Sequence, residues 1–172
     1  MDMEIRRIHS DEWKEYKGIR LRGLQSEPYA FMMSYPEEQA RTDDYWKRVV
    51  LRISTSSIDY MFVAIRDGTM VGTTAVYFGV SAKTRHVALI GTVYVDNLYR
   101  GQGIGRKLLQ AVLDLAQDDR LIRKVKLTVN PVQEAAVALY TSFGFQKTAV
   151  LGGELQVDGQ LYDEWVMEKQ IS

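Results

Sequence analysis

Hydrophobic residues recur along the chain with two different periods, one typical of strands and one typical of helices. Residues 3–8 (MEIRRI) alternate between apolar and polar side chains, which predicts a first strand. Apolar residues then return at helical spacing between residues 13 and 24, behind a polar capping position, and predict a first helix. A second helix is expected from a Thr42 cap to about Ile53.

The middle of the chain has the pattern of a meander of strands. Residues 60–78 contain two β-rich runs, and they are joined by Asp67-Gly68, a dipeptide that strongly favours a hairpin turn. Residues 86–95 (HVALIGTVYV) form a third run, apolar enough to predict a strand that is buried on both faces. A glycine-rich stretch follows this run, before the next helical pattern.

The last part of the chain alternates helices with strands. Helical spacing predicts a helix over about 106–117 and a short apolar helix over 134–143. Strands are expected at 124–129 (KVKLTV) and in a final hairpin, whose two arms cover about 145–151 and 161–167. The element order is therefore βααβββαβαββ. It predicts an α/β (α+β) fold, in which a mixed, mostly antiparallel sheet of about seven strands is flanked by about four helices.

Composition and charge narrow the classes of function. The 172 residues suit a single domain over 1–172, and 22 basic side chains balance 22 acidic ones. This balance gives no reason to expect a nucleic-acid partner. With no cysteine and only two histidines, disulfides, cysteine nucleophiles and metal sites are not expected. The N-terminal MDMEIRRIHSDEW has no signal-peptide core and no run reaches membrane-spanning length, so a cytoplasmic protein without a membrane partner is expected.

Three glycines alternate in the stretch YRGQGIG (Tyr99–Gly105), between a strand pattern and a helix pattern. A tight turn explains one or two of them. Backbone N–H groups at a helix start bind anions, and glycine leaves them open to a ligand, so the stretch favours an anion-binding loop. The Walker pattern is not met, because Arg106 stands where its second glycine is required. The G-x-G-x-G spacing also differs from the Rossmann G-x-G-x-x-G.

Residues 100–105 (RGQGIG) match the pattern [Q/R]-x-x-G-x-[G/A] of the GNAT superfamily of N-acetyltransferases. The strand VYV before them and the downstream segment VNPVQEAAVALYTSFGF resemble the same family, as does the order of the elements. The resemblance covers essentially the whole chain. It implies the GNAT fold and an enzyme that uses acetyl-CoA to acetylate an amine. Homodimers are common in this family, so the resemblance leaves a homodimer open.

The resemblance assigns most of the predicted site to acetyl-CoA, and it implies no metal. In this family the glycine loop binds the pyrophosphate, and the preceding strand offers backbone groups to the pantetheine arm in a gap beside the next strand. Gln133 stands where many relatives have asparagine, so its contact is expected to have altered geometry. The predicted coenzyme-binding residues are Val93, Tyr94, Val95, Arg100, Gly101, Gln102, Gly103, Ile104, Gly105, Arg106, Asn130, Gln133 and Tyr140.

Tyr140 is the predicted catalytic residue. It occupies the tyrosine of the family pattern A-x-x-L-Y-x-x-x-G-F, here AVALYTSFGF at 136–145. The resemblance implies that this phenol lies beside the coenzyme sulfur and protonates the departing thiolate. A hydroxyl donor on a rigid aromatic arm suits that task. Spacing alone would favour a core tyrosine on an apolar helix.

The sequence leaves open which group takes the proton from the amine. Many relatives carry a glutamate on the strand that corresponds to 88–95, where this chain has no carboxylate. Three alternatives remain: a water chain held by Thr92 or Tyr94, His86, or a carboxylate from the acceptor side. The candidate carboxylates are Glu37, Glu38, Glu154 and Asp163.

The acceptor is expected to bind between the segment SEPYAFMMSYPEEQARTDDYW (residues 26–46) and the final hairpin. That segment is either an aromatic-walled pocket whose carboxylates attract an amine, or a surface loop with its own small cluster. The predicted substrate-binding residues are Tyr29, Phe31, Tyr35, Glu37, Glu154 and Tyr162. The expected reaction is direct transfer to a primary amine of a small molecule or peptide. The alternatives are acetylation of protein N-termini or lysines, and a non-catalytic acyl-CoA-binding regulatory module of the same fold.

Overall fold

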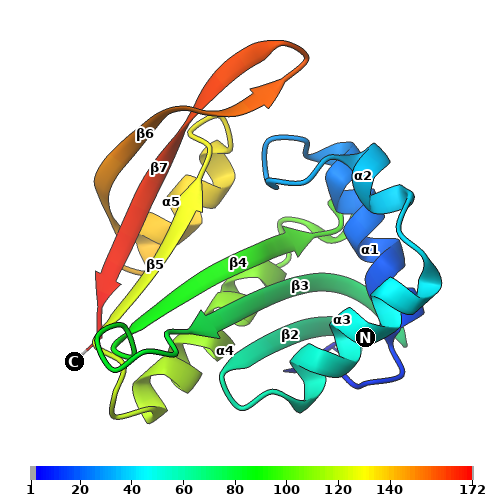
Figure 1. Ribbon diagram of the computed structural model, residues 1–172, viewed down its shortest axis with the longest axis horizontal. Coiled ribbons are helices and arrows are strands. Elements are labelled where there is room, and N and C mark those ends of the chain that lie inside the picture. Colours follow the sequence, from blue (N-terminus) through cyan, green and yellow to red (C-terminus); the bar gives the residue numbers. More distant parts are fainter. Residues whose placement is uncertain (1–2, 172) are drawn as a thin grey trace.

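Seven strands form a single sheet within residues 3–171, the part of the chain that the computed structural model describes. Helices cover both faces of this sheet (Figure 1). The strands are β1 (Met3–Arg7), β2 (Asp59–Arg66), β3 (Thr69–Phe78), β4 (Val87–Val95), β5 (Lys124–Val129), β6 (Gln146–Val157) and β7 (Gln160–Gln170). The helices are α1 (Trp13–Ser26), α2 (Tyr35–Gln39), α3 (Asp43–Thr55), α4 (Ile104–Asp118) and α5 (Glu134–Ser142), with a 3₁₀ helix η1 (Asn97–Tyr99) before α4.

The strands lie in the order β1-β2-β3-β4-β5-β7-β6, and every neighbouring pair is antiparallel except β4–β5, which is parallel. This arrangement confirms the predicted mixed, mostly antiparallel sheet. The described residues form five α-helices, one more than predicted. The additional helix is α2, which begins with a capping box between Ser34 and Glu37 and carries Pro36 in its first turn.

Local signals place most of the boundaries. The Thr42 hydroxyl caps α3 by accepting from the backbone N–H of Tyr45 at 3.3 Å. Asp67 and Gly68 both adopt positive φ in the β2–β3 turn, as a two-residue type I′ hairpin requires. The final hairpin is longer than predicted, because β6 continues past an irregularity in its pairing with β7 between Leu151 and Leu155.

Two hydrophobic cores lie on opposite faces of the sheet. On one face α1 packs against β3 and α3 against β2, and Trp46, Met61 and Val63 are buried in the same cluster. On the other face α4 packs against β2, β3 and β4, and its Leu109 is buried in one cluster with Leu127 of β5 and Tyr140 of α5. The sheet is therefore the middle of three layers. Within residues 3–171 no helix is long and apolar enough to cross a membrane.

The sheet splits where β4 and β5 diverge (Figure 1). The two strands pair only between Val87–Leu89 and Lys124–Lys126. A β-bulge in β4 accompanies the divergence: Thr92 has a φ of 51°, and its carbonyl accepts from the Thr73 hydroxyl at 3.1 Å. A bulge bends its strand and increases its twist. The expectation that β4 is buried on both faces is therefore wrong, since Leu89 is 39% exposed beside the split.

Candidate active site

A cavity of about 790 Å³ occupies the gap between β4 and β5. Its walls come from the end of α1 and the loop after it, from β4 and β5, from the glycine loop with the start of α4, and from α5. Ten of the predicted site residues line it: Phe31, Val93, Tyr94, Val95, Arg100, Gly101, Ile104, Gly105, Gln133 and Tyr140. The structure thus brings the predicted coenzyme strand, glycine loop and tyrosine to one cavity.

The glycine loop presents open backbone at the start of α4. Gly101 and Gly103 adopt left-handed φ values of 72° and 79°, and no atom beyond their chain neighbours lies within 4 Å of where a Cβ would stand. Gly103 is the N-cap of α4, so the first N–H groups of the helix lie next to it. Gly105 differs, because a Cβ there would be 3.3 Å from Leu139 of α5. This open helix start fits an anion.

The polar side chains of the loop are bonded to other elements. Arg100 lines the cavity, but its guanidinium donates to Glu27 at the end of α1 at 2.6 Å. Gln102 accepts from Arg66 of β2, and Arg106 donates to a serine of α5 at 2.9 Å. Neither Gln102 nor Arg106 is part of the cavity lining. The capacity of the loop to bind an anion therefore depends mainly on its backbone N–H groups.

Two buried polar atoms near the split lack a hydrogen-bond partner among residues 3–171. They are the hydroxyl of Thr92, at the bulge of β4, and Nδ2 of Asn130, directly after β5. Buried polar groups are normally paired, and Thr92 lines the cavity, so its hydroxyl is the one of the two that a ligand between the strands can approach. Asn130 is 1% exposed and lies behind the cavity wall, where its Oδ1 accepts from the Val132 N–H at 3.0 Å. This bond shapes the turn that leads into α5.

Tyr140 reaches the cavity from α5 while most of its side chain is buried. It is 5% exposed, and its ring packs on Phe145 with the centroids 6.0 Å apart. Burial raises the pKa of the Tyr140 hydroxyl well above its ordinary value of 10.0. The phenol therefore stays protonated at neutral pH and can donate a proton to a group in the cavity.

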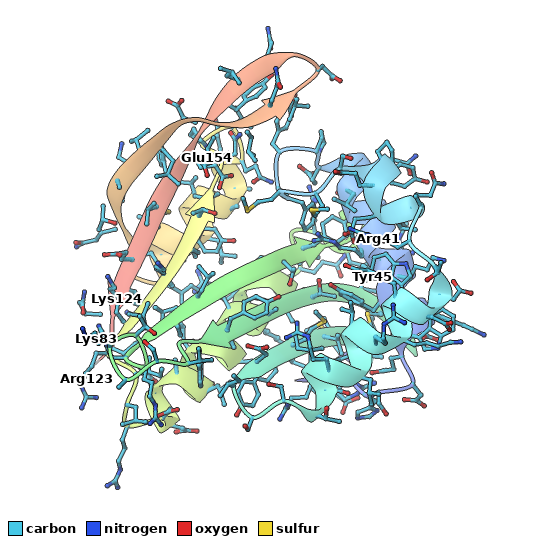
Figure 2. All side chains as sticks on the ribbon, in the orientation of Figure 1. Arg41, Tyr45, Lys83, Arg123, Lys124 and Glu154 are labelled. Atoms are coloured by element: carbon cyan, nitrogen blue, oxygen red, sulfur yellow. The ribbon has the colours of Figure 1, made fainter. Side chains whose placement is uncertain are left out.

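Of the six predicted acceptor residues, Phe31 alone lines the cavity. Tyr29 and Tyr162 pack together with ring centroids 4.9 Å apart, which joins the loop after α1 to β7. Figure 2 shows Glu154 at the end of the sheet where β4 and β5 have separated. These residues surround the cavity without forming its wall.

The other two predicted acceptor residues belong to α2. Tyr35 is its first residue, and the Glu37 carboxylate accepts from the Ser34 N–H at 2.9 Å in the capping box. Glu37 is exposed and outside the cavity lining. The structure thus gives Glu37 a role in helix capping.

A buried ion pair on the acceptor side joins α1 to α2. Nε of Arg20 lies 3.6 Å from the Glu38 carboxylate, and the guanidinium lies 4.4 Å above the ring of Phe31. Both charged side chains are largely buried, and Arg20 lines the cavity. Arg20 was not predicted from the sequence, because the contact depends on how α2 folds back onto α1.

Glu164 of β7 is a second residue that was not predicted from the sequence. It is 6% exposed, although glutamate is rarely buried without a partner. Burial raises the pKa of its carboxyl, a side-chain hydrogen bond from Thr128 lowers it, and the nearby charge of Glu154 raises it. Thr128 lines the cavity. The strand alternation in LYDEWVM was the available signal, since it puts Glu164 on one face with Tyr162.

Comparison with known proteins identifies the family. The chain matches the acetyltransferase (GNAT) family over residues 6–145. It is 35% identical over 121 residues to the N-alpha-acetyltransferase RimI of Mycobacterium tuberculosis, covering 68% of this chain and 72% of that protein. It is 24% identical over 139 residues to the L-amino acid N-acetyltransferase AaaT of Escherichia coli, covering 81% and 82%. The chain belongs to the GNAT family and is an acyltransferase.

A solved structure shares the fold over the whole chain. The structure of yncA from Salmonella typhimurium, determined with its cofactor acetyl-CoA, has a TM-score of 0.84 and 20% sequence identity, and the match covers 100% of this chain and 95% of that one. In the present chain the open glycine loop suits a diphosphate, and the separated strands with the unpartnered Thr92 hydroxyl suit an extended amide-bearing arm.

Proposed function

We propose that this protein transfers the acetyl group of acetyl-CoA directly to a primary amine of a small molecule or peptide. One observation carries the proposal: the glycine loop at the start of α4 and Tyr140 of α5 line the same cavity, in the split between β4 and β5. An anion-binding helix start and a buried proton donor are the two parts needed to hold a coenzyme thioester and to help its thiolate leave.

The edge of β4 supports binding of the pantetheine arm. Beyond Leu89 this edge has no partner on β5, so backbone groups along Val93–Val95, apart from the Val95 carbonyl, are available to an extended ligand. The carbonyl of Val95 already accepts from Nε of Arg100 at 3.0 Å, which holds the side chain of Arg100 against the strand. The N–H groups of Gln102 to Arg106 would hold the diphosphate, and Gln133 would contact the arm from the turn before α5.

Tyr140 is proposed to give its proton to the departing thiolate. The phenol is neutral at neutral pH, which is the form that a general acid requires, and it reaches the cavity from α5. Direct transfer is favoured because the chain has no cysteine to carry the acetyl group. The active site then needs to bring the amine and the thioester together in one complex.

Two kinds of acceptor are supported by different relatives. The M. tuberculosis relative is named as an N-alpha-acetyltransferase, which supports the amino terminus of a peptide or protein. The E. coli relative is named as an L-amino acid N-acetyltransferase, which supports a free amino acid. A non-catalytic acyl-CoA-binding module is the remaining alternative, and it is supported by the absence of a carboxylate from β4.

We expect thiol release from acetyl-CoA that depends on an added amine. The test panel consists of free L-amino acids and short peptides with a free N-terminus, with the N-terminally blocked forms as controls. Turnover with one class and not with the other identifies the acceptor. If calorimetry detects acetyl-CoA binding but no amine releases thiol, the protein is a binding module. Tighter binding of ATP than of acetyl-CoA would contradict the coenzyme assignment.

A further inference from the structure

The acceptor side of the cavity offers several carboxylates that could take a proton from the amine, and most are held by other contacts. Glu37 is exposed and caps α2. Asp163 is exposed and accepts from the Gly153 N–H at 2.9 Å. Glu38 is buried, but the positive charge of Arg20 lies 3.6 Å away and keeps it in an ion pair. None of these three is placed to act as a free base.

Glu164 lies on the face of β7 that it shares with Thr128 of β5, a residue of the cavity wall. In the register of β5 and β7, Thr128 is opposite Val166 and Val129 is opposite Trp165. Side chains alternate between the two faces of a sheet, so Thr128, Val166 and Glu164 share one face, with Glu164 diagonal to Thr128. Of these two neighbours, Thr128 is exposed and lines the cavity, and its hydroxyl can bond the Glu164 carboxylate behind it.

The surroundings of Glu164 suit a group that gains and loses a proton. Burial and the charge of Glu154 raise the pKa of its carboxyl, while the hydrogen bond from Thr128 lowers it. The lysine at the other end of this face does not neutralise it, because Lys124 donates to Glu168 at 2.8 Å. Figure 2 shows Lys124 at the end of the sheet opposite to Glu154. The charged and titratable groups near this face are Lys124, Lys126, Glu154, Tyr162 and Glu168, with Tyr29 stacked on Tyr162.

We propose that Thr128 and Glu164 form the proton-accepting pair for the acceptor amine, in which the Thr128 hydroxyl takes a proton from the ammonium and passes its own to the Glu164 carboxylate. This inference rests on the proposed acetyl transfer and adds the residues that make the amine nucleophilic. Thr128 is the group that contacts the acceptor. Glu164 acts through it, as the residue that positions the hydroxyl and stores the proton.

The atoms and charges balance in this scheme. The ammonium loses one proton to the Thr128–Glu164 pair, and its neutral nitrogen then forms a bond to the acetyl carbonyl carbon. The carbon–sulfur bond breaks with its electron pair on sulfur, and the thiolate takes the phenol proton of Tyr140. The acetylated nitrogen gives up its second proton, which restores the phenol through water. Glu164 then releases its proton to solvent.

The variant Glu164→Gln keeps the shape of the side chain but cannot hold the proton. We expect kcat near neutral pH to fall about 10²-fold, as is typical when a general base is lost. The loss should shrink as the pH approaches the pKa of the amine, because the acceptor then arrives neutral. The acceptor is the amine that the wild type uses best in the panel of amino acids and peptides. Acetyl-CoA affinity, measured by calorimetry, should not change.

Substitutions of Thr128 separate a chemical role from a packing role. Thr128→Val matches the shape of threonine without its hydroxyl, and it should lower kcat about as much as Glu164→Gln. Thr128→Ser keeps the hydroxyl and should restore most of kcat. A side chain that served only to fill space would show the opposite order, with valine the better replacement.

Glu168→Gln is the matched control. It removes a carboxylate from the same face of the same strand, at the end of the sheet where β4 and β5 are still paired. This variant should leave kcat and its pH profile unchanged. A readout that does not need turnover is the ¹³C NMR titration of the glutamate carboxyl carbons. The resonance that is missing in Glu164→Gln should titrate above the ordinary pKa of glutamate, and higher still in Thr128→Val, where the hydrogen bond is lost.

The experiments distinguish failure of the pair from failure of the proposed function. If the wild type acetylates a panel amine and Glu164→Gln has the same kcat and pH profile, the pair is not the proton acceptor and the acetyl transfer stands. If the wild type acetylates no amine in the panel, the proposed function fails and the pair fails with it. An ordinary titration of the Glu164 carboxyl would also overturn the inference.

Discussion

Gly103→Glu should lower the affinity for acetyl-CoA by about 10²-fold or more. Gly103 caps α4 with a φ of 79°, and the space beside its Cα, where a glutamate side chain would extend, is open. The new carboxylate would cover the first N–H groups of the helix and repel the diphosphate. Loss of two hydrogen bonds to a charged group, at about 1.5–3 kcal/mol each, corresponds to a change of this size. Isothermal titration calorimetry with acetyl-CoA measures it.

Gly159→Glu is a control that matches this change in charge and in backbone geometry. Gly159 also has a φ of 79°, and no atom lies within 4 Å of where its Cβ would stand, but it belongs to the turn between β6 and β7, outside the cavity lining. It therefore carries the same backbone strain and the same added carboxylate. If the two variants bind acetyl-CoA with equal affinity, the glycine loop is not the diphosphate site.

Elements that depend on neighbouring residues in the chain were predictable from the sequence. The Thr42 cap, the Asp67-Gly68 hairpin and the strand at 124–129 are all specified by side chains within a few positions. Amphipathic spacing also located α4, although the helix begins at Ile104, two residues before the predicted start. The correct fold class follows from the order of such locally determined elements.

Features that depend on contacts between distant segments were not predictable from the residues alone, and the gap beside β4 was expected only from the family resemblance. The bulge in β4 places Thr92 at positive φ, although threonine does not favour that region, because Thr73 of β3 holds its carbonyl. This bulge, together with the loss of pairing after Leu89, opens the sheet for a ligand. Helix α2 was missed because its signal is short: Ser34 and Glu37 form the capping box, but the helix has only five residues.

The donor side of the site was far easier to predict than the acceptor side. A glycine loop followed by a helix is contiguous in sequence, and its residues keep their relation whatever the rest of the fold does. The acceptor side brings together residues that are distant in sequence, such as Arg20 with Glu38 and Thr128 with Glu164. Their burial and pairing appear only when α2 and β7 are in place. For this reason the sequence indicates Asp163 as a candidate base but not the buried Glu164 beside it.

Tyr140→Phe should lower kcat by about 10²–10³-fold and leave acetyl-CoA affinity nearly unchanged. The change removes one oxygen from a ring that stays packed on Phe145, so the cavity keeps its shape. What is lost is the proposed proton donor to the thiolate, and general acid catalysis typically contributes about 10²–10⁴-fold. Steady-state thiol release with the best amine of the panel gives kcat, and calorimetry gives the coenzyme affinity.

Tyr16→Phe provides the matched control for this loss. Tyr16 is also 5% exposed, and burial raises the pKa of its hydroxyl to about 12, but it lies in the other core against Trp46 and outside the cavity lining. Removing its hydroxyl tests the effect of losing a buried phenol oxygen without touching the site, so kcat should remain at the wild-type value. If Tyr140→Phe also turns over at the wild-type rate, the thiolate leaves unaided. Tyr140 would then contribute to the shape of the cavity and not to the chemistry.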